Sequence, residues 1–305
     1  MSATLKINWL SYLDPRVYGG GGERVTRELL EEAGRRGHQV RISSVRWGKL
    51  SRLLGGRTRV HRNPDRWILT DLWNCPEEGR HFPESFLEAA VRSRRLVTFD
   101  NAWTTICSRA FFPCGGDPVA CPDRCARDRA WQHYSAAALT VFVSPLQRKC
   151  VESVLGQRLP QALEIPPTVD KQFFHRLGYE RDIPYLFVGT ISDYKGAIEV
   201  EKEYGYRGLH WAGRNVTGRP LEGTHLGFLD DFALRDVYNR AETVVHLPRW
   251  VEPMGRNVIE ALLCGCRVVL NEKVGAAGWG RTEGEIRALP GGASVFWDKV
   301  EGLSR

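Results

Sequence analysis

Short apolar runs alternate with stretches of helical periodicity along most of the chain. The first apolar run, Leu5–Ser11, is followed by a glycine cluster at Gly19–Gly22 and by a stretch from Glu23 whose apolar positions recur at helical spacing. Strands and helices that alternate in this way predict a parallel β-sheet covered by helices on both faces. Further strands are expected at Gln39–Val45, Trp67–Trp73, Leu96–Asn101 and Leu139–Ser144, and further helices at Glu84–Arg94 and Leu146–Leu155.

The alternation restarts after Ile165–Asp170, a segment that two adjacent prolines keep stiff and extended. We therefore expect two doubly wound α/β domains, residues 1–165 and 166–290, and a C-terminal helix in residues 291–305 that packs back toward the first domain. Ligands of such sheets bind beyond the carboxyl ends of the strands. In the second domain, strands are expected at Tyr185–Gly189, Leu209–Gly213, Thr243–Leu247 and Arg267–Asn271, and helices at Gly196–Glu203, Phe232–Ala241 and Asn257–Leu263.

Composition and charge narrow the class of protein. Apolar residues make up 42% of the chain and charged residues 26%, as in soluble globular proteins. Without a long apolar run or a signal-peptide pattern, a cytoplasmic location is expected, with peripheral binding at the inner membrane surface as the alternative. Residues 1–165 hold 25 Lys and Arg against 17 Asp and Glu, whereas residues 166–305 hold 18 against 19. This excess favours an acidic or phosphorylated partner, and a solvated arginine-rich surface fits it equally well.

The most specific segment is Trp250–Gly265, which follows an apolar strand and opens a helix. Gly255 lets the backbone approach a ligand closely, and the N–H groups at the start of the helix can bind a phosphate. Glu252 and Glu260, with seven residues between them, can accept hydrogen bonds from the hydroxyls of a hexose and a ribose, and Arg256 adds a positive charge near the phosphates. The alternative is an ordinary strand–turn–helix with two solvent-facing acids.

This segment resembles the Glu-x7-Glu donor motif of glycosyltransferase family 4, whose members are retaining enzymes. The resemblance implies the GT-B fold, in which two Rossmann-like doubly wound domains face a central cleft. It covers nearly the whole chain and is most specific over residues 185–270. The other matching segments are the glycine loop, helix and strand of Gly19–Val40, the interdomain stretch Pro167–Phe173, the loop Phe187–Gly196, and Leu226–Gly227 with Leu234–Ala241.

Carried over by position, the resemblance implies that Lys195 contacts the donor diphosphate, Glu252 the transferred sugar and Glu260 the ribose. The donor is expected to be a UDP- or GDP-sugar. No catalytic metal is expected, because the chain lacks an Asp-x-Asp pair and such enzymes use helix dipoles and basic side chains instead. The predicted donor-site residues are Gly20, Gly21, Gly189, Thr190, Lys195, Arg214, Glu252, Met254, Gly255, Arg256, Asn257 and Glu260.

Two positions depart from the family. Thr190 stands where the family usually has an arginine, and Arg214 and Arg256 are the candidates to replace that cation. On the acceptor side, Phe99 stands where many members have a histidine, so Asp100 becomes the candidate that orients an acceptor hydroxyl or takes its proton. A helix or turn cap is the alternative role for Asp100. The predicted catalytic residues are Asp100, Glu252 and Lys195.

Four cysteines cluster in an insert at residues 102–130. Their spacing and the neighbouring prolines and glycines fit a structural zinc site with no open position, and free thiols or disulfides are the alternatives. The candidate ligands are Cys107, Cys114, Cys121 and Cys125.

The function predicted from these patterns is hexose transfer from a nucleotide sugar to a saccharide or a lipid-linked acceptor. Basic and aromatic residues mix in the segment Trp47–Trp67, which suits an anionic membrane surface or a nucleic acid. Two alternatives therefore stay open: a glycosyltransferase that acts on hydroxymethylated DNA, and a non-enzymatic zinc-containing nucleic-acid-binding protein. No obligate protein partner is expected.

Overall fold

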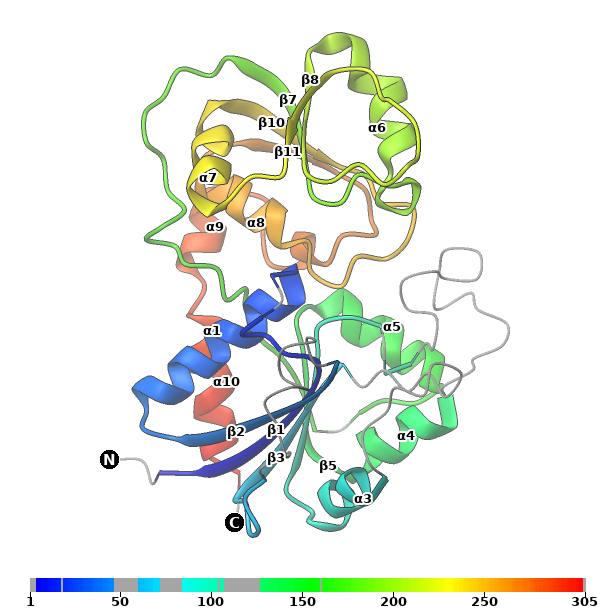
Figure 1. Ribbon diagram of the computed structural model, residues 1–305, viewed down its shortest axis with the longest axis vertical. Coiled ribbons are helices and arrows are strands. Elements are labelled where there is room, and N and C mark those ends of the chain that lie inside the picture. The colour runs from blue at the N-terminus through cyan, green and yellow to red at the C-terminus, as the bar shows by residue number, and fades with distance from the viewer. Residues whose placement is uncertain are drawn as a thin grey trace, which may run out of the picture. The chain divides into compact units, whose positions relative to one another are not determined.

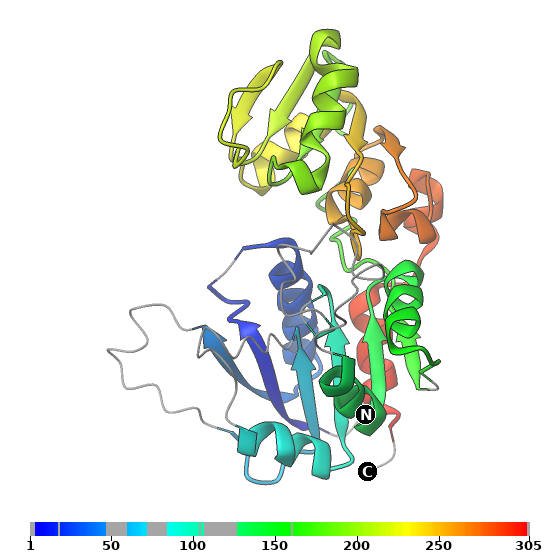
Figure 2. The same ribbon diagram turned by 90° about the vertical axis from the view of Figure 1, so that its right-hand side faces the viewer.

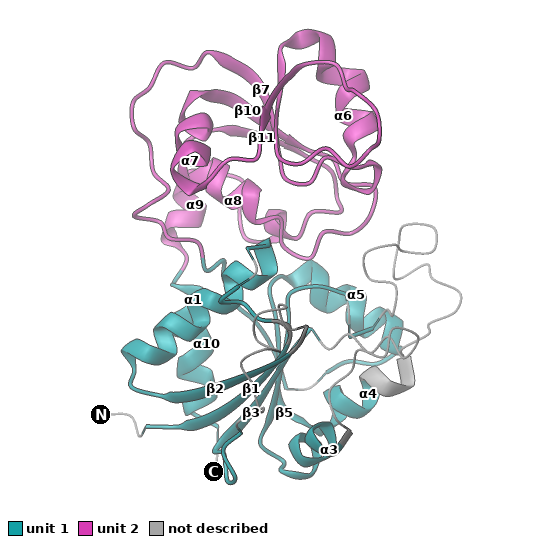
Figure 3. Cartoon of the chain, in the orientation of Figure 1, with its two compact units in different colours: residues 1–168, 290–305 teal, residues 169–289 magenta. Residues whose placement is uncertain are grey.

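The computed structural model describes residues 4–17, 19–46, 60–71, 84–103, 105–106, 127–159 and 161–303. The chain divides into two compact units (Figure 3). Unit 1 comprises residues 1–168 and 290–305, and unit 2 comprises residues 169–289. Each unit is built on its own parallel β-sheet with its own core.

Unit 1 holds a six-stranded sheet in the order β2-β1-β3-β4-β5-β6, and all of its strand pairs are parallel. The central strands β3 and β4 are buried at every position. Burial on both faces explains why these strands are continuous apolar runs rather than alternating ones. The strands are β1 (Lys6–Leu13), β2 (Gln39–Arg46), β3 (Arg66–Thr70), β4 (Leu96–Asp100), β5 (Ala137–Phe142) and β6 (Ala162–Glu164).

Helices α1 (Gly21–Arg35) and α10 (Gly292–Glu301) cover one face of this sheet, and α3 (Glu84–Arg92), α4 (Arg127–Ala136) and α5 (Pro145–Leu155) cover the other (Figures 1 and 2). From β1 the sheet extends in two opposite directions. Because the crossovers in both directions are right-handed, their helices lie on opposite faces of the sheet. The last helix is fixed by Trp297, which is fully buried and donates its indole N–H to the carbonyl of Leu29 in α1 at 2.7 Å. Arg36 at the end of α1 bonds Asp298 of α10 at 2.7 Å.

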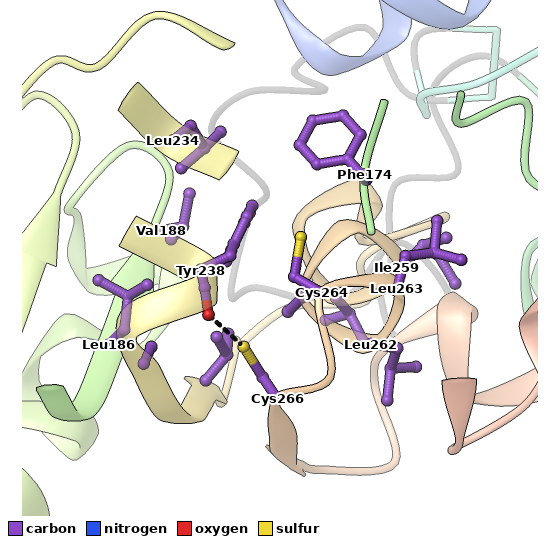
Figure 4. Close-up of a cluster of buried hydrophobic side chains, with 14 of the residues drawn as sticks. Phe174, Leu186, Val188, Leu234, Tyr238, Ile259, Leu262, Leu263, Cys264 and Cys266 are labelled. Carbon is purple, nitrogen blue, oxygen red and sulfur yellow. Dashed lines mark hydrogen bonds between the residues drawn. The ribbon is translucent and has the colours of Figure 1, made fainter. Parts of the chain in front are cut away.

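Unit 2 holds a five-stranded parallel sheet in the order β11-β10-β7-β8-β9. Its strands are β7 (Ile183–Val188), β8 (Leu209–Ala212), β9 (Thr224–Gly227), β10 (Ala241–His246) and β11 (Arg267–Leu270). Helix α6 (Ala197–Tyr204) packs on one face, and α7 (Asp231–Arg240) and α8 (Arg256–Leu263) pack on the other (Figure 1). Figure 4 shows the core beneath α7 and α8, where the thiol of Cys266 donates to the carbonyl of Tyr238 at 3.0 Å.

Each sheet has one point at which the order of its strands reverses. In unit 1 this point lies between β1 and β3, and in unit 2 it lies between β7 and β10. Connections leave the two strands toward opposite faces there, so the loops diverge and leave room for a ligand beyond the carboxyl ends. The candidate site residues on the described part of the chain all lie near the carboxyl end of a strand, which is β1, β4, β7, β8 or β10. Each of them either ends its strand or belongs to the segment that follows the strand.

The prediction of two doubly wound α/β domains is confirmed. Among the α-helices and strands of the described residues, four were not predicted: β6, β9, α4 and α9 (Glu283–Ala288). Strand β9 is an edge strand whose residues are mostly exposed, so it lacks the apolar run by which the other strands were recognised. Strand β6 has three residues and α9 has six, which is too short for a periodic pattern. Much of the predicted insert, residues 102–130, lies outside the described residues.

Replacing Trp297 by alanine should destabilise unit 1, because the change leaves a large cavity between α10 and α1 and removes the indole hydrogen bond. We expect a loss of about 3–5 kcal/mol in the free energy of unfolding. Hydrogen exchange of the β1 and α1 amides reports on unit 1 alone and is the measurement to use. The exposed Lys299→Ala on the same helix is the control, and equal exchange in the two variants would contradict the assigned packing.

Candidate functional site

The carboxyl ends of β7 and β10 bring together two segments far apart in the sequence. The segment after β7 contains Gly189, Thr190 and the 3-10 turn η2 (Asp193–Lys195), and the segment after β10 leads through a loop to α8. The two are joined where the amide N–H of Arg249 donates to the carbonyl of Tyr194 at 3.0 Å.

Gly196 makes this close approach possible. It has a φ of +82°, and a Cβ at this position would lie 1.9 Å from the carbonyl oxygen of Leu247. Only glycine fits there, so residue 196 fixes how near the loop after β7 comes to the loop after β10.

Lys195 and Glu252 meet at this place. The Lys195 ammonium donates to Oε2 of Glu252, and both side chains are mostly buried. The ammonium also lies 5.6 Å from the centre of the Trp250 ring, which packs edge-on against Tyr194. An aromatic face attracts a cation, so the buried ring of Trp250 helps to hold the ammonium of Lys195.

The backbone of Glu252 is fixed by a second segment. Its N–H donates to the carbonyl of Lys273 at 2.7 Å, and its carbonyl accepts from Gly275 at 3.0 Å. Lys195 and His246 both approach Oε2 of its carboxylate, and among the described residues no hydrogen bond or ion pair reaches Oε1. Burial alone raises the pKa of this carboxyl, but the positive Lys195 and the ring of His246 outweigh burial and hold the pKa at about 2. Glu252 is therefore an anion with one oxygen available to a ligand hydroxyl.

His246 is a site residue that was not predicted. It ends β10, is 2% exposed, and places Nε2 3.8 Å from Oε2 of Glu252. On its other side, Nδ1 lies 3.4 Å from the amide nitrogen of Asn257, which also donates to the carbonyl of Val188 at 2.9 Å. In the sequence, His246 could have been recognised as a polar residue at the end of an otherwise apolar strand.

The start of α8 is open to an anion. Gly255 is its N-cap with a φ of +81°, so no side chain caps the first turn. A Cβ on Gly255 would lie 2.9 Å from Val274, which ties the turn to the neighbouring segment. The buried Met254 contributes its carbonyl to the same anchoring by accepting from Ala276. The first N–H groups of a helix are positive and lack partners within the helix, so this turn can bind a phosphate.

Glu260 and Arg256 lie one turn apart on α8 and bond each other. Nε of Arg256 donates to Oε1 of Glu260 at 2.7 Å, and the Tyr238 hydroxyl donates to Oε2 at 3.2 Å. Glu260 is 3% exposed, so both of its oxygens are used inside the protein. A ribose hydroxyl would have to share or replace one of these bonds.

Arg214 follows the neighbouring strand β8 and is exposed. Its carbonyl accepts from Ile191 at 2.9 Å, which places Arg214 beside the segment that contains Thr190. Thr190 and Gly189 are exposed as well. Arg214 therefore supplies a cation in the segment beside Thr190.

Asp100 ends β4 in unit 1 and is buried. Thr105 donates to its Oδ1 at 2.7 Å, and the Tyr134 hydroxyl donates to its Oδ2. Burial raises the pKa of Asp100, and these donors only partly offset burial, so the pKa is about 6. Asp100 therefore changes its charge near neutral pH, although protein donors occupy both oxygens.

Asp71 follows β3 beside Asp100 and was not predicted, because it lay within an expected strand. It has a φ of +48°, and its Oδ1 accepts from the backbone N–H groups of Asn101 at 2.9 Å and Ala102 at 3.0 Å. Burial and the nearby Asp100 carboxylate raise the pKa of Asp71 well above its usual range. Gly20 and Gly21 are exposed at the start of α1, at the same edge of the sheet.

Comparison with solved structures decides the fold. Anabaena HepE in complex with UDP-glucose superposes with a TM-score of 0.59 at 16% identity, covering 97% of this chain and 88% of that chain. Sucrose-phosphate synthase from Thermosynechococcus elongatus gives a TM-score of 0.65 at 14% identity, covering 97% and 96%. A glycosyltransferase from Rickettsia africae gives 0.62 at 14%, covering 98% and 87%.

The chain has the GT-B fold. No protein-family model matches the sequence, and no curated protein matches it by sequence. Within this GT-B chain the structure brings Lys195 and Glu252 into contact, together with the start of α8, in unit 2. The third predicted catalytic residue, Asp100, belongs to unit 1.

Two further expectations concern metal and membrane. The candidate zinc ligands Cys107, Cys114, Cys121 and Cys125 lie outside the residues that the structure describes. Over the described part of the chain, no three His, Cys, Asp or Glu side chains are grouped to hold a metal ion. Within those same ranges, no helix has the length and apolar character to cross a membrane.

Replacing Lys195 by methionine should raise the pKa of Glu252 from about 2, because burial then acts on the carboxyl with only the ring of His246 to oppose it. A ¹³C NMR titration of the Glu252 carboxyl measures this change, with the exposed Lys202→Met as control. The depressed pKa also predicts stability that is present above pH 4.5 and is lost as the pH falls through 2. An unchanged titration in Lys195→Met would contradict the ion pair.

Proposed function

We propose that the protein is a retaining glycosyltransferase that moves a hexose from a nucleotide-diphosphate sugar to a saccharide acceptor, free or lipid-linked. The observation that carries this proposal is the contact of Lys195 with Glu252 beside the uncapped start of α8, at the point where the strand order of unit 2 reverses. A cation, the start of a helix without a side-chain cap and an anionic acceptor for hydroxyl groups at one place match a diphosphate joined to a sugar.

In this proposal each group has one task. Lys195 and the first amides of α8 hold the diphosphate and stabilise the charge that develops as it leaves. Oε1 of Glu252 accepts a hydrogen bond from a hexose hydroxyl. Glu260 binds the ribose after sharing its bond with Tyr238 or Arg256, and Arg214 supplies the cation that Thr190 lacks. The positions of these groups require no metal ion for binding.

The departing diphosphate can itself accept the proton of the acceptor hydroxyl on the same face of the sugar. Retention then needs no covalent intermediate, and the main requirement is that donor and acceptor are held together. Asp100 is the proposed contact that orients the acceptor hydroxyl, because its pKa of about 6 leaves its carboxylate mostly ionised at neutral pH.

A UDP-sugar is the first donor to test, since the HepE structures were solved with UDP and with UDP-glucose. Thermal unfolding in the presence of a panel of UDP- and GDP-sugars identifies the donor, because a ligand that binds the folded state raises the midpoint. Acceptors follow: saccharides, lipid-linked saccharides, and duplex DNA with hydroxymethylated bases. Transfer to DNA alone would favour the DNA-modifying alternative, and no binding of any nucleotide sugar would contradict the proposal.

Replacing Lys195 by methionine should weaken binding of UDP about tenfold to hundredfold, because a charge-assisted contact to the diphosphate is lost. Uridine lacks the diphosphate, so its affinity should stay within about twofold. Calorimetric titration of both ligands measures the two effects, with Lys202→Met as control. Equal losses for UDP and uridine would contradict the role of Lys195.

Replacing Asp100 by asparagine should lower the turnover rate about a hundredfold without changing the Kd of the donor, because the carboxylate acts on the acceptor. Asparagine keeps the size of the side chain and can accept from Thr105. Steady-state kinetics and donor titration give the two quantities. A variant that loses donor binding instead would show that Asp100 supports the structure rather than the acceptor.

A further inference from the structure

Lys195 has two partners in the proposed reaction. In the structure its ammonium bonds Oε2 of Glu252, whereas the proposed function requires it at the diphosphate. If Lys195 turns toward the diphosphate, the mostly buried carboxylate of Glu252 loses its strongest partner. A buried charge without a partner is costly, so a second donor has to be at hand.

His246 is placed to be that donor. Its Nδ1 faces the amide nitrogen of Asn257 at 3.4 Å. The same amide group of Asn257 lies 2.9 Å from the carbonyl oxygen of Val188. The amide atom that faces this oxygen has to be the nitrogen, because two oxygen acceptors cannot form a hydrogen bond with each other. Nδ1 is therefore the acceptor, and in the neutral ring the proton sits on Nε2.

Among the described residues the Nε2–H group has no hydrogen-bond partner, and it is buried. It lies 3.8 Å from Oε2 of Glu252, which is beyond hydrogen-bond range by less than 1 Å. A buried donor without a partner is rare, and a small movement of the carboxylate would satisfy it. Around the ring lie Glu252 and Lys195 from the loops, Asn257 from α8, and the uncharged Phe187 from β7.

We propose that His246 is a positioning residue for the donor sugar: when Lys195 moves to the diphosphate, the Nε2–H group of His246 takes over Oε2 of Glu252 and keeps Oε1 available to a hexose hydroxyl. This proposal rests on the proposed function. It attributes the affinity that the sugar adds to donor binding to a hydrogen bond between His246 and Glu252 that forms only in the complex.

The first test observes the ring itself. Two-bond ¹H–¹⁵N NMR spectra of the imidazole should give the Nε2-protonated tautomer in the free protein and with saturating UDP-glucose. The Nε2 proton should move downfield on addition of UDP-glucose, because a hydrogen bond to a carboxylate forms. An Nδ1-protonated ring, or an Nε2 proton that does not move, would overturn the proposal.

The second test separates the sugar from the nucleotide. Calorimetry gives the Kd values of UDP and UDP-glucose for the wild type, His246→Leu and His246→Gln. Leucine removes the donor, whereas the glutamine amide can place a nitrogen near the position of Nε2. We expect His246→Leu to bind UDP-glucose about tenfold more weakly relative to UDP, and His246→Gln to stay within about threefold of the wild type. The exposed His225→Leu is the control in the same unit.

The outcomes distinguish the two proposals. A wild type that binds neither UDP nor UDP-glucose contradicts the UDP-sugar function and the role of His246 together. A wild type that binds UDP-glucose more tightly than UDP, with the same preference in His246→Leu, contradicts the role of His246 alone. If His246→Leu does not fold, the glutamine variant and the NMR spectra decide.

Discussion

The site in unit 2 depends on the neutralisation of one buried carboxylate. Burial raises the pKa of Glu252, and the ammonium of Lys195 together with the ring of His246 lowers it to about 2, so the carboxylate stays ionised. These two residues come from different loops, one after β7 and one after β10. Their ion pair therefore joins the two segments that flank the reversal of strand order, and in the proposed function the same pair supplies a cation and an anion to the donor.

Backbone geometry makes this arrangement possible. Gly196 permits contact between the two loops, and Gly255 permits the turn that begins α8 without a side-chain cap. Neither position accepts a side chain without displacing its neighbour. Lys195, Glu252 and His246 thus lie together on segments that are anchored to a parallel sheet. Such anchoring holds the backbone of these segments in place.

Much of this could be predicted from the sequence, because buried parallel strands are apolar runs and the segment around Glu252 has a specific spacing. The exposed strand β9 carries no such run and was missed. The pairing of Arg256 with Glu260 follows from their separation of four residues on a helix and could have been expected. The hydrogen bond from Tyr238 to Glu260 could not, because it joins α7 to α8 through tertiary packing. His246 left only a weak signal, a polar end to an apolar strand.

The central claim is that a nucleotide sugar binds at the carboxyl ends of β7 and β10. Hydrogen exchange of the backbone amides tests this claim most directly. The exchange rates of the free protein are compared with those at saturating UDP-glucose. The account predicts slower exchange in residues 189–196 and 251–258, where the loops and the start of α8 contact the ligand. Binding accompanied by protection only in other segments would contradict it.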